Sequence, residues 1–241
     1  MRGTGRLLGR IGVFLALLLG LMIGLGLLIT KVLQHTYPIS AEDGIDRSLA
    51  AGRTPSATAV SQFFSLVGST NVVIAVLLIV AIVFRLVFRR WRESVFLLLA
   101  VSTQVAIFVL TTLAISRRRP AVHRLDASPP TSSFPSGHTG ASTALYVGIA
   151  LVIAWHTRDS WARWPIVALL VAVPLSVALS RLYRGMHHPS DVLAAFVNGG
   201  LCVVIAARNL LFGALPDSVA RRLDGPGARS PAVPGVSRAG G

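Results

Sequence analysis

Apolar residues form long uninterrupted stretches in this chain, and charged residues are largely confined to the gaps between them. Six stretches have about the length that a helix needs to cross the hydrocarbon core of a bilayer. We place the predicted spans at residues 11–30, 69–88, 94–115, 139–156, 164–180 and 191–208. The pattern therefore predicts an all-α polytopic membrane protein with six transmembrane helices.

The first apolar stretch, IGVFLALLLGLMIGLGLLI, follows Arg2, Arg6 and Arg10 and so resembles a signal peptide. Its nineteen apolar or glycine residues exceed the roughly 7–15 residues of a usual signal-peptide core. No clear cleavage motif of small residues follows it. We expect this segment to be retained as a membrane anchor.

Composition supports the membrane class and removes several others. The chain is 53% hydrophobic and only 13% charged, with a mean hydropathy of +0.69. Its net charge is +14. However, the sequence has no basic stripe interleaved with aromatic residues, which is the pattern that would indicate a nucleic-acid partner. Cys202 is the single cysteine, which excludes an intrachain disulfide and a cysteine metal site.

The distribution of Lys and Arg predicts the orientation and the domain limits. Fourteen of these residues fall on the side of the N-terminus and nine on the other side, which favours both termini in the cytoplasm. Residues 1–210 would form a single membrane domain, with an external loop over residues 34–67 that carries a helix lying at the interface. The Pro-, Gly- and Ser-rich composition indicates that residues 211–241 are a disordered cytoplasmic tail.

Two of the predicted outer loops carry most of the side chains that could do chemistry. The first contains RRRPAVHRLDASPPTSSFPSGH, over residues 117–138, and the second contains SRLYRGMHHPSD, over residues 180–191. Arginine side chains and the backbone N–H groups of a helix start bind phosphate esters. Histidine can act as a nucleophile or a proton donor near neutral pH. We therefore expect a phosphate-ester site at the outer membrane face.

The spacing within these loops suggests individual roles. Gly137 opens the fourth span and lets the backbone approach a ligand closely, while Ser136 adds a hydroxyl. Asp191 follows His187 by four residues, at the start of a span that begins near Pro189. Its carboxylate could reach back one turn and orient the imidazole.

These loops resemble the three signature motifs of the type 2 phosphatidic acid phosphatase superfamily, the lipid phosphate phosphatases. The second motif is matched by PSGH over residues 135–138, and the third, SR-x5-H-x3-D, by SRLYRGMHHPSD over residues 180–191. The first motif is K-x6-RP; Arg119 and Pro120 match its end, but Thr112 stands at the lysine position. The resemblance covers roughly residues 60–208 and implies a six-helix membrane phosphatase. The missing lysine leaves open how strongly phosphate is bound; Arg117 or Arg118 is a candidate to compensate.

The resemblance implies a mechanism without metal or cofactor. His187 would attack phosphorus to give a phosphohistidine, with Asp191 holding its other ring nitrogen, and His138 would protonate the leaving oxygen and then activate water. The charge on the phosphoryl oxygens would be held by Arg119, Arg181, the Ser136 hydroxyl and the Gly137 amide. His188 lies outside the motif, and we expect it to be a solvated neighbour.

The expected substrate is a lipid phosphate whose tail stays in the bilayer. Undecaprenyl diphosphate or a related polyprenyl phosphate comes first, with phosphatidic acid and phosphatidylglycerol phosphate as alternatives. The protein would lie in the plasma (inner) membrane, with its catalytic loops facing outside or the periplasm. A lipid phosphotransferase of the same superfamily, a catalytically impaired scaffold and a transporter are the competing hypotheses, and the sequence does not indicate an oligomeric state.

Overall fold

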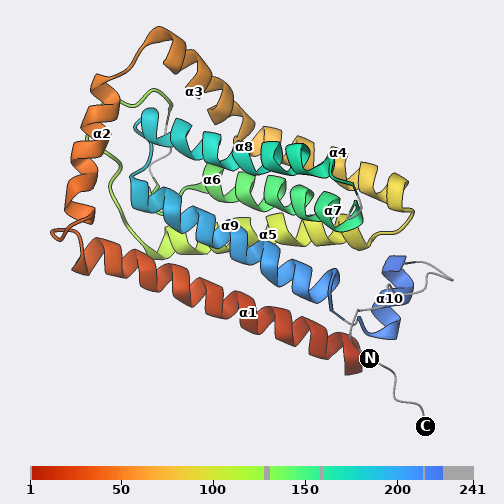
Figure 1. Ribbon diagram of the computed structural model, residues 1–241. Helices are drawn as coiled ribbons and strands as arrows, with labels where there is room; N and C mark the ends of the chain where they lie inside the picture. Colours follow the sequence, from red (N-terminus) through yellow and green to blue (C-terminus); the bar gives the residue numbers. More distant parts are fainter. Residues whose placement is uncertain (1, 128–130, 158–159, 214, 225–241) are drawn as a thin grey trace.

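A computed structural model describes residues 2–127, 131–157, 160–213 and 215–224, and its elements are helical (Figure 1). Six helices of the described chain are long and apolar enough to cross a membrane, and they coincide with the six predicted spans: Thr4–Val32, Thr70–Phe88, Arg92–Ala114, Gly137–His156, Arg163–Tyr183 and Pro189–Leu210. The α-helices are α1 (Arg2–Leu27), α2 (Glu42–Ala51), α3 (Pro55–Val67), α4 (Thr70–Phe88), α5 (Arg92–Ala114), α6 (Gly137–Ser142), α7 (Gly148–His156), α8 (Arg163–Tyr183), α9 (Pro189–Leu210) and α10 (Asp217–Asp224). Short helices also occur at η1 (Leu28–Val32), η2 (Ile39–Ala41) and η3 (Thr143–Val147).

The spans lie side by side in one bundle, with α9 packed against α1, α5 and α6 (Figure 1). The largest core cluster includes Phe96 and Leu97 of α5, Leu145 and Val152 of the fourth span, and Val203 of α9. Many apolar side chains on the outer faces of the spans are exposed, as a bilayer requires. The most buried surfaces therefore belong to the fourth span and α9, which carry the second and third motifs.

The fourth span approaches α9 very closely because glycines lie at the crossing. A Cβ on Gly199 would lie 2.6 Å from the carbonyl oxygen of Gly140 and 2.7 Å from Cβ of Thr143. The π-helical turn η3 interrupts the span directly below its first turns, and such turns are frequent at functional sites. This crossing holds Gly137 and His138 beside the first turn of α9.

Residues 34–67 form two α-helices and the short helix η2 at one end of the bundle, where the sequence indicated an interfacial helix (Figure 1). Helix α3 begins after Thr54, whose Oγ1 accepts a hydrogen bond from Ala57 N at 3.2 Å, and Pro55 occupies its first position. Helix α3 packs on α8, and α2 lies across the end of the bundle. The hydrogen bonds of α2, described below, connect it to the first turn of α9.

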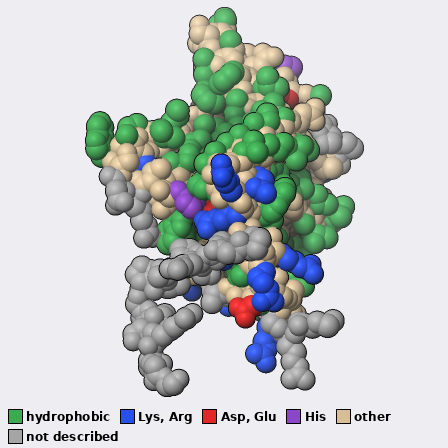
Figure 2. Space-filling model, turned by 90° about the vertical axis from the view of Figure 1, so that its right-hand side faces the viewer, with side chains coloured by type: hydrophobic (Ala, Val, Ile, Leu, Met, Phe, Trp, Pro, Cys, Tyr) green, Lys and Arg blue, Asp and Glu red, His purple; other side chains and the backbone are tan. Residues whose placement is uncertain are grey.

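At the opposite end, α10 differs from the disorder predicted for residues 211–241. Trp91 N donates to the carbonyl of Leu223 at 2.7 Å, and Arg92 pairs with Asp224 at 2.9 Å. These contacts hold α10 against the start of α5, while residues 225–241 lie outside the described part of the chain. Lys and Arg side chains gather on this end, the one predicted to be cytoplasmic (Figure 2).

Candidate active site

The three motifs meet at the end of the bundle that carries α2. A cavity of about 370 Å³ is lined by Arg119, Gly137, His138, Arg181 and His187. Arg119 follows α5, Gly137 and His138 begin α6, Arg181 lies in the last turn of α8, and His187 precedes α9. The convergence expected from the sequence is therefore present, and five of the seven predicted site residues line one cavity.

His187 is held in the tautomer that a nucleophile needs. Its Nδ1 lies 2.7 Å from the backbone carbonyl of Ser133. Because a carbonyl oxygen only accepts, Nδ1 carries the proton and Nε2 keeps its lone pair. Burial lowers the pKa of His187, against the raising effect of Asp191. The ring is therefore neutral near neutral pH.

Asp191 does not make the hydrogen bond expected of it. Its Oδ2 lies 3.8 Å from Nδ1 of His187 and instead accepts the backbone N–H of His188 at 2.9 Å. Its other oxygen pairs with Arg117. The carboxylate is drawn away because it caps the first turn of α9. The direct partner of His187 is thus Ser133, whose carbonyl a motif search cannot reveal.

Arg119 and Arg181 present unused donors at the cavity. Arg119 Nη1 donates to the carbonyl of Met186 at 2.7 Å, and Arg181 Nη1 donates to Asp126 at 2.6 Å and to Ser65 at 2.5 Å. The Nε atoms of both arginines are buried without a hydrogen-bond partner. A buried, unpaired N–H of a charged group is costly, so the protein itself compensates these two cavity-lining cations only in part.

Asp126 organises the basic side of the site and was not singled out in the sequence. It pairs with Arg181 and Arg184, each at 2.6 Å. Burial raises the pKa of Asp126, but the hydrogen bond from Arg184 and the charges of both arginines outweigh this effect and lower the pKa to about 2. It is the one carboxylate of the loop over residues 116–138. A single carboxylate among several arginines is the sequence feature that could have identified Asp126 as part of the site.

The PSGH residues divide between structural and cavity positions. The Ser136 hydroxyl lies 3.0 Å from Oγ1 of Thr139, and the backbone N–H of Ser136 donates to the carbonyl of Asp191 at 3.1 Å. Ser136 therefore lies behind the cavity wall. Gly137 lines the cavity beneath Phe108, where a Cβ would lie 2.9 Å from the ring. Its N–H belongs to the first turn of α6, where no intrahelical acceptor exists.

Helix α2 contacts the third motif through carboxylates. Glu42 accepts from Ser190 N at 2.6 Å and pairs with Arg117 at 2.6 Å. Asp46 lies 2.7 Å from Nδ1 of His188, which is only 8% exposed. Burial lowers the pKa of His188, but the hydrogen bond to Asp46 and the charge of Asp191 raise it above its usual value overall. The expectation that His188 is a solvated neighbour is therefore wrong.

Among the residues that the structure describes, no side chain takes the place of the motif lysine in the cavity. Thr112 does not line it, and its hydroxyl is buried without a partner. Arg117 is engaged by Glu42 and Asp191, so its charge is already compensated. Arg118 is exposed and lines outer cavities instead.

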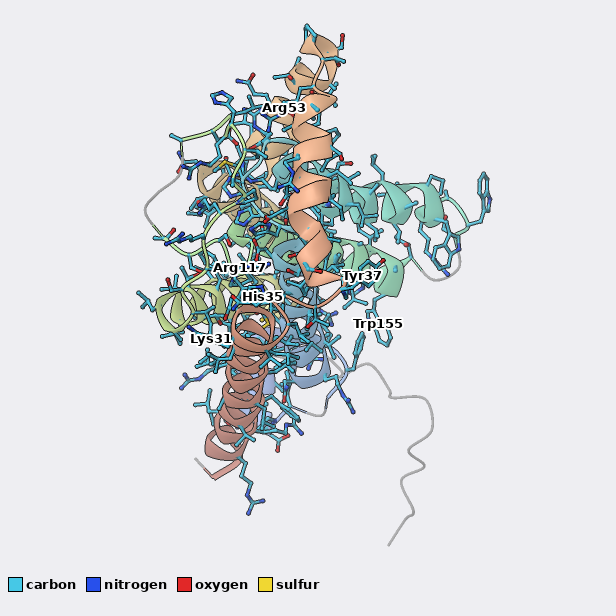
Figure 3. All side chains as sticks on the ribbon, turned by 90° about the vertical axis from the view of Figure 1, so that its left-hand side faces the viewer. Lys31, His35, Tyr37, Arg53, Arg117 and Trp155 are labelled. Atoms are coloured by element: carbon cyan, nitrogen blue, oxygen red, sulfur yellow. The ribbon has the colours of Figure 1, made fainter. Side chains whose placement is uncertain are left out.

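A larger outer cavity of about 700 Å³ adjoins the site and shares Arg119 with it. Lys31, His35 and Arg117 line this outer cavity and lie close together beside the end of α1 in Figure 3. Four Lys or Arg side chains and two carboxylates line the outer cavity, and the net positive charge is suited to attracting anions toward the site.

One group of possible metal ligands lies beside the outer cavity. Donor atoms of Asp43, Asp46 and His188 fall within 4.8 Å of one another. Nδ1 of His188 already hydrogen-bonds to Asp46 at 2.7 Å, so a proton accounts for this contact. Neither aspartate lines the cavity that contains His187.

Known proteins resemble the chain in sequence. The model of the PAP2 superfamily matches residues 94–212. Phosphatidylglycerophosphatase B of Bacillus subtilis is 25% identical over 174 residues, 71% of this chain and 85% of the relative. Lipid A 1-phosphatase of Rhizobium etli is 34% identical over 98 residues, 38% of each chain, and phospholipid phosphatase 1 of Rattus norvegicus is 34% identical over 76 residues, 30% of this chain and 27% of the relative.

Solved structures share the fold. The PAP2-type phosphatidylglycerolphosphate phosphatase from Bacillus subtilis superimposes with a TM-score of 0.66 at 22% identity, covering 86% of this chain and 94% of that one. Aquifex aeolicus LpxE gives a TM-score of 0.54 at 22% identity over 68% and 93% of the two chains. Through residues 94–212, the chain therefore belongs to the PAP2 superfamily, as a lipid phosphatase with six membrane-spanning helices.

Proposed function

We propose that the chain hydrolyses the terminal phosphate of a membrane lipid phosphate or diphosphate through a phosphohistidine on His187. The observation that carries this proposal is that Arg119 and Arg181 line the same cavity as His187 and His138, and that the protein leaves the Nε–H group of each arginine without a hydrogen-bond partner. Two fixed cations with free donors beside a neutral imidazole suit phosphoryl transfer, where positioning and charge stabilisation supply most of the catalysis.

In the first step, Nε2 of His187 attacks phosphorus as the bond to the lipid oxygen breaks. His138, in its protonated form in the substrate complex, donates a proton to that departing oxygen, and the lipid alcohol leaves, or the lipid monophosphate when the substrate is a diphosphate. The carbonyl of Ser133 stabilises the positive charge on the ring through Nδ1–H, which it already accepts at 2.7 Å. Arg119, Arg181 and the Gly137 N–H hold the charge on the phosphoryl oxygens.

In the second step, water attacks the phosphohistidine. His138, now neutral, takes a proton from that water, the N–P bond breaks, and inorganic phosphate leaves. Asp191 acts as a positioning residue that fixes the first turn of α9 rather than as a direct partner of the ring. We propose that the arginines and the start of α6 supply the positive charge without a divalent cation, and activity in EDTA tests this point.

The lipid tail would leave the site between α4 and α5. The cavity wall there is apolar and includes Val73 and Ile74 of α4 and Val101 and Val105 of α5. This wall suits a polyprenyl chain as well as acyl chains. Undecaprenyl diphosphate, phosphatidic acid and phosphatidylglycerol phosphate are therefore the substrates to compare, the last because one relative is named for it.

We further propose that the chain lies in the plasma (inner) membrane with the catalytic cavity facing outside or the periplasm. The excess of Lys and Arg at the opposite end, fourteen against nine in the predicted loops, supports this orientation.

Trapping the covalent intermediate tests the mechanism. Acid-labile ³²P label should remain on wild-type protein quenched during turnover of labelled phosphatidic acid, and it should be absent from His187→Gln. His156→Gln is the matched control, because His156 contacts Glu93 outside the cavity, and it should label like wild type. Label that persists in His187→Gln would place the nucleophile elsewhere. Product analysis separates a hydrolase, which releases inorganic phosphate, from a phosphotransferase, which phosphorylates an added alcohol.

A further inference from the structure

Another hollow, distinct from the catalytic and outer cavities, lies between α1 and α9, at the end of the bundle opposite to His187. Its polar part is a cavity of about 420 Å³. It continues into an apolar groove of about 290 Å³, and the two parts share Phe14, Arg208 and Asn209. Nineteen residues separate Pro189, at the start of α9, from Arg208, which places this hollow roughly 28 Å from the catalytic end at ~1.5 Å per residue. It is therefore separate from the catalytic cavity.

Two arginines converge on the polar part of the hollow. Arg10 Nε donates to Oδ1 of Asn209 at 2.7 Å, and Asn209 is itself fixed by donating to the carbonyl of Ile205 at 2.7 Å. This bond aims Arg10 into the hollow while its terminal amino groups stay available. The guanidinium of Arg208 has no hydrogen bond or ion pair with any described residue. No Asp or Glu of the described chain lines either part.

The apolar groove runs from these arginines toward the middle of the bundle. Leu17, Leu18 and Leu21 of α1 form one wall, and Leu201, Val204 and Ile205 of α9 form the other. From Phe14 to Leu21 the groove follows α1 for about 10 Å at ~1.5 Å per residue. Charge at a helix end would explain arginines in general, but two arginines from different helices at the mouth of one apolar groove match the shape of a phospholipid.

We propose that this hollow binds an anionic phospholipid of the leaflet opposite to the catalytic cavity. Its phosphate and headgroup contact Arg10 and Arg208, and one acyl chain lies in the groove. Basic pockets between transmembrane helices bind anionic headgroups in this way. A lipid at this position bridges α1 and α9 and so stabilises the packing of the first span on the catalytic helix. It is bound, not hydrolysed, since His187 lies at the other end of α9.

Native mass spectrometry of the detergent-purified chain tests the proposal directly. The probes are phosphatidylglycerol and phosphatidylethanolamine with identical acyl chains. Both are phosphodiesters without a terminal phosphate, so neither is a substrate of the proposed hydrolysis. We expect wild type to retain one phosphatidylglycerol with at least about tenfold preference, which corresponds to about 1.4 kcal/mol, and phosphatidylglycerol to raise its thermal unfolding midpoint.

Three variants separate the parts of the site. The double variant Arg10→Gln/Arg208→Gln should lose the preference and the thermal shift. The matched control Arg221→Gln/Arg222→Gln removes the same charge from the exposed face of α10 at the same end and should keep both. Val204→Trp fills the groove with the arginines intact and should weaken retention of the lipid. Unfolding midpoints without added lipid, compared with wild type, show that each variant is folded.

Several results would overturn the proposal. Equal retention of the two lipids by wild type would exclude recognition of the anionic headgroup. If the α10 control lost the lipid preference as fully as Arg10→Gln/Arg208→Gln, the preference would depend only on the net charge of this end of the protein. Unchanged retention in Val204→Trp would exclude the groove as the position of the acyl chain. A dimer in which this groove is covered by a second copy of the chain would replace the lipid with a protein occupant.

Discussion

His187 shows how a single ring is prepared by groups far from it in the sequence. The carbonyl of Ser133 fixes the protonated nitrogen of His187, and burial lowers the pKa of His187, so the neutral imidazole predominates near neutral pH. Arg119 and Arg181 stand in the same cavity with unused donors. The site therefore combines a neutral imidazole, the proposed nucleophile, with cations that the protein compensates only in part.

Arg119→Gln tests the partly satisfied cations. Loss of a fixed donor to the charged phosphoryl oxygens should lower kcat/KM by about 10²–10³, measured as phosphate release. Arg118→Gln removes the same charge from a neighbouring exposed side chain outside the catalytic cavity, and it should change kcat/KM less than about threefold. Equal effects of the two substitutions would show that Arg119 acts through the overall charge of the loop.

The contact between His188 and Asp46 predicts a pH-dependent stability. The folded pKa of His188 is raised above its unperturbed value of 6.5. Its contribution to stability is therefore full below pH 6.5 and is lost as the pH rises through the folded pKa. The thermal midpoint of wild type should fall more between about pH 6 and about pH 9 than that of His188→Gln. Parallel pH profiles for the two proteins would contradict this.

Motif spacing could predict His187, His138, Arg119 and Arg181 because each lies within a few residues of other motif members. It could not predict Asp46, which is 142 residues from His188. Short-range patterns carry no information about such partners. The predicted hydrogen bond between Asp191 and His187 is absent for a related reason: Arg117 and the backbone cap of α9 occupy that carboxylate instead.

Hydropathy could not predict the positions of helices α2 and α10. The six spans could be predicted because their apolar runs have the length that a bilayer requires. Helix α2 is polar, but its Glu42 and Asp46 do not face water. They are buried against the third motif at the start of α9. Helix α10 forms on a Pro/Gly-rich tail because the start of α5 offers a docking surface.

The crossing of the fourth span and α9 depends on Gly199. Gly199→Ala places a Cβ 2.6 Å from a backbone oxygen and should lower the free energy of unfolding by about 1–3 kcal/mol, seen as a lower thermal midpoint and reduced activity. Gly200→Ala is the neighbouring control: nothing lies within 4 Å of its Cβ, and alanine favours the helix by up to ~1 kcal/mol. A midpoint for Gly199→Ala at or above that of Gly200→Ala would rule out a tight crossing.

The whole molecule has two chemically distinct ends. One carries His138, His187 and His188, the outer cavity and α2, and the other carries α10 and the arginines visible in Figure 2. This polarity is what the sequence-based orientation relied on, and it is the reason for proposing that the catalytic end faces the outside.

Cysteine labelling in intact cells tests that orientation. Thr36→Cys, exposed near the outer cavity, should react with a membrane-impermeant thiol reagent, whereas Ser218→Cys on α10 should react only after the membrane is opened. The native Cys202 is buried, so it gives little background. The reverse labelling pattern would place the catalytic cavity on the cytoplasmic side.

Phosphate release by the purified protein in detergent and EDTA tests the central claim most directly. Wild type and His187→Ala would be compared on phosphatidic acid, phosphatidylglycerol phosphate and undecaprenyl diphosphate. We predict that wild type releases phosphate from at least one of these lipids and that His187→Ala, folded by its thermal midpoint, releases none. Release at the wild-type rate by His187→Ala, or no release by folded wild type from any of the three, would contradict the account.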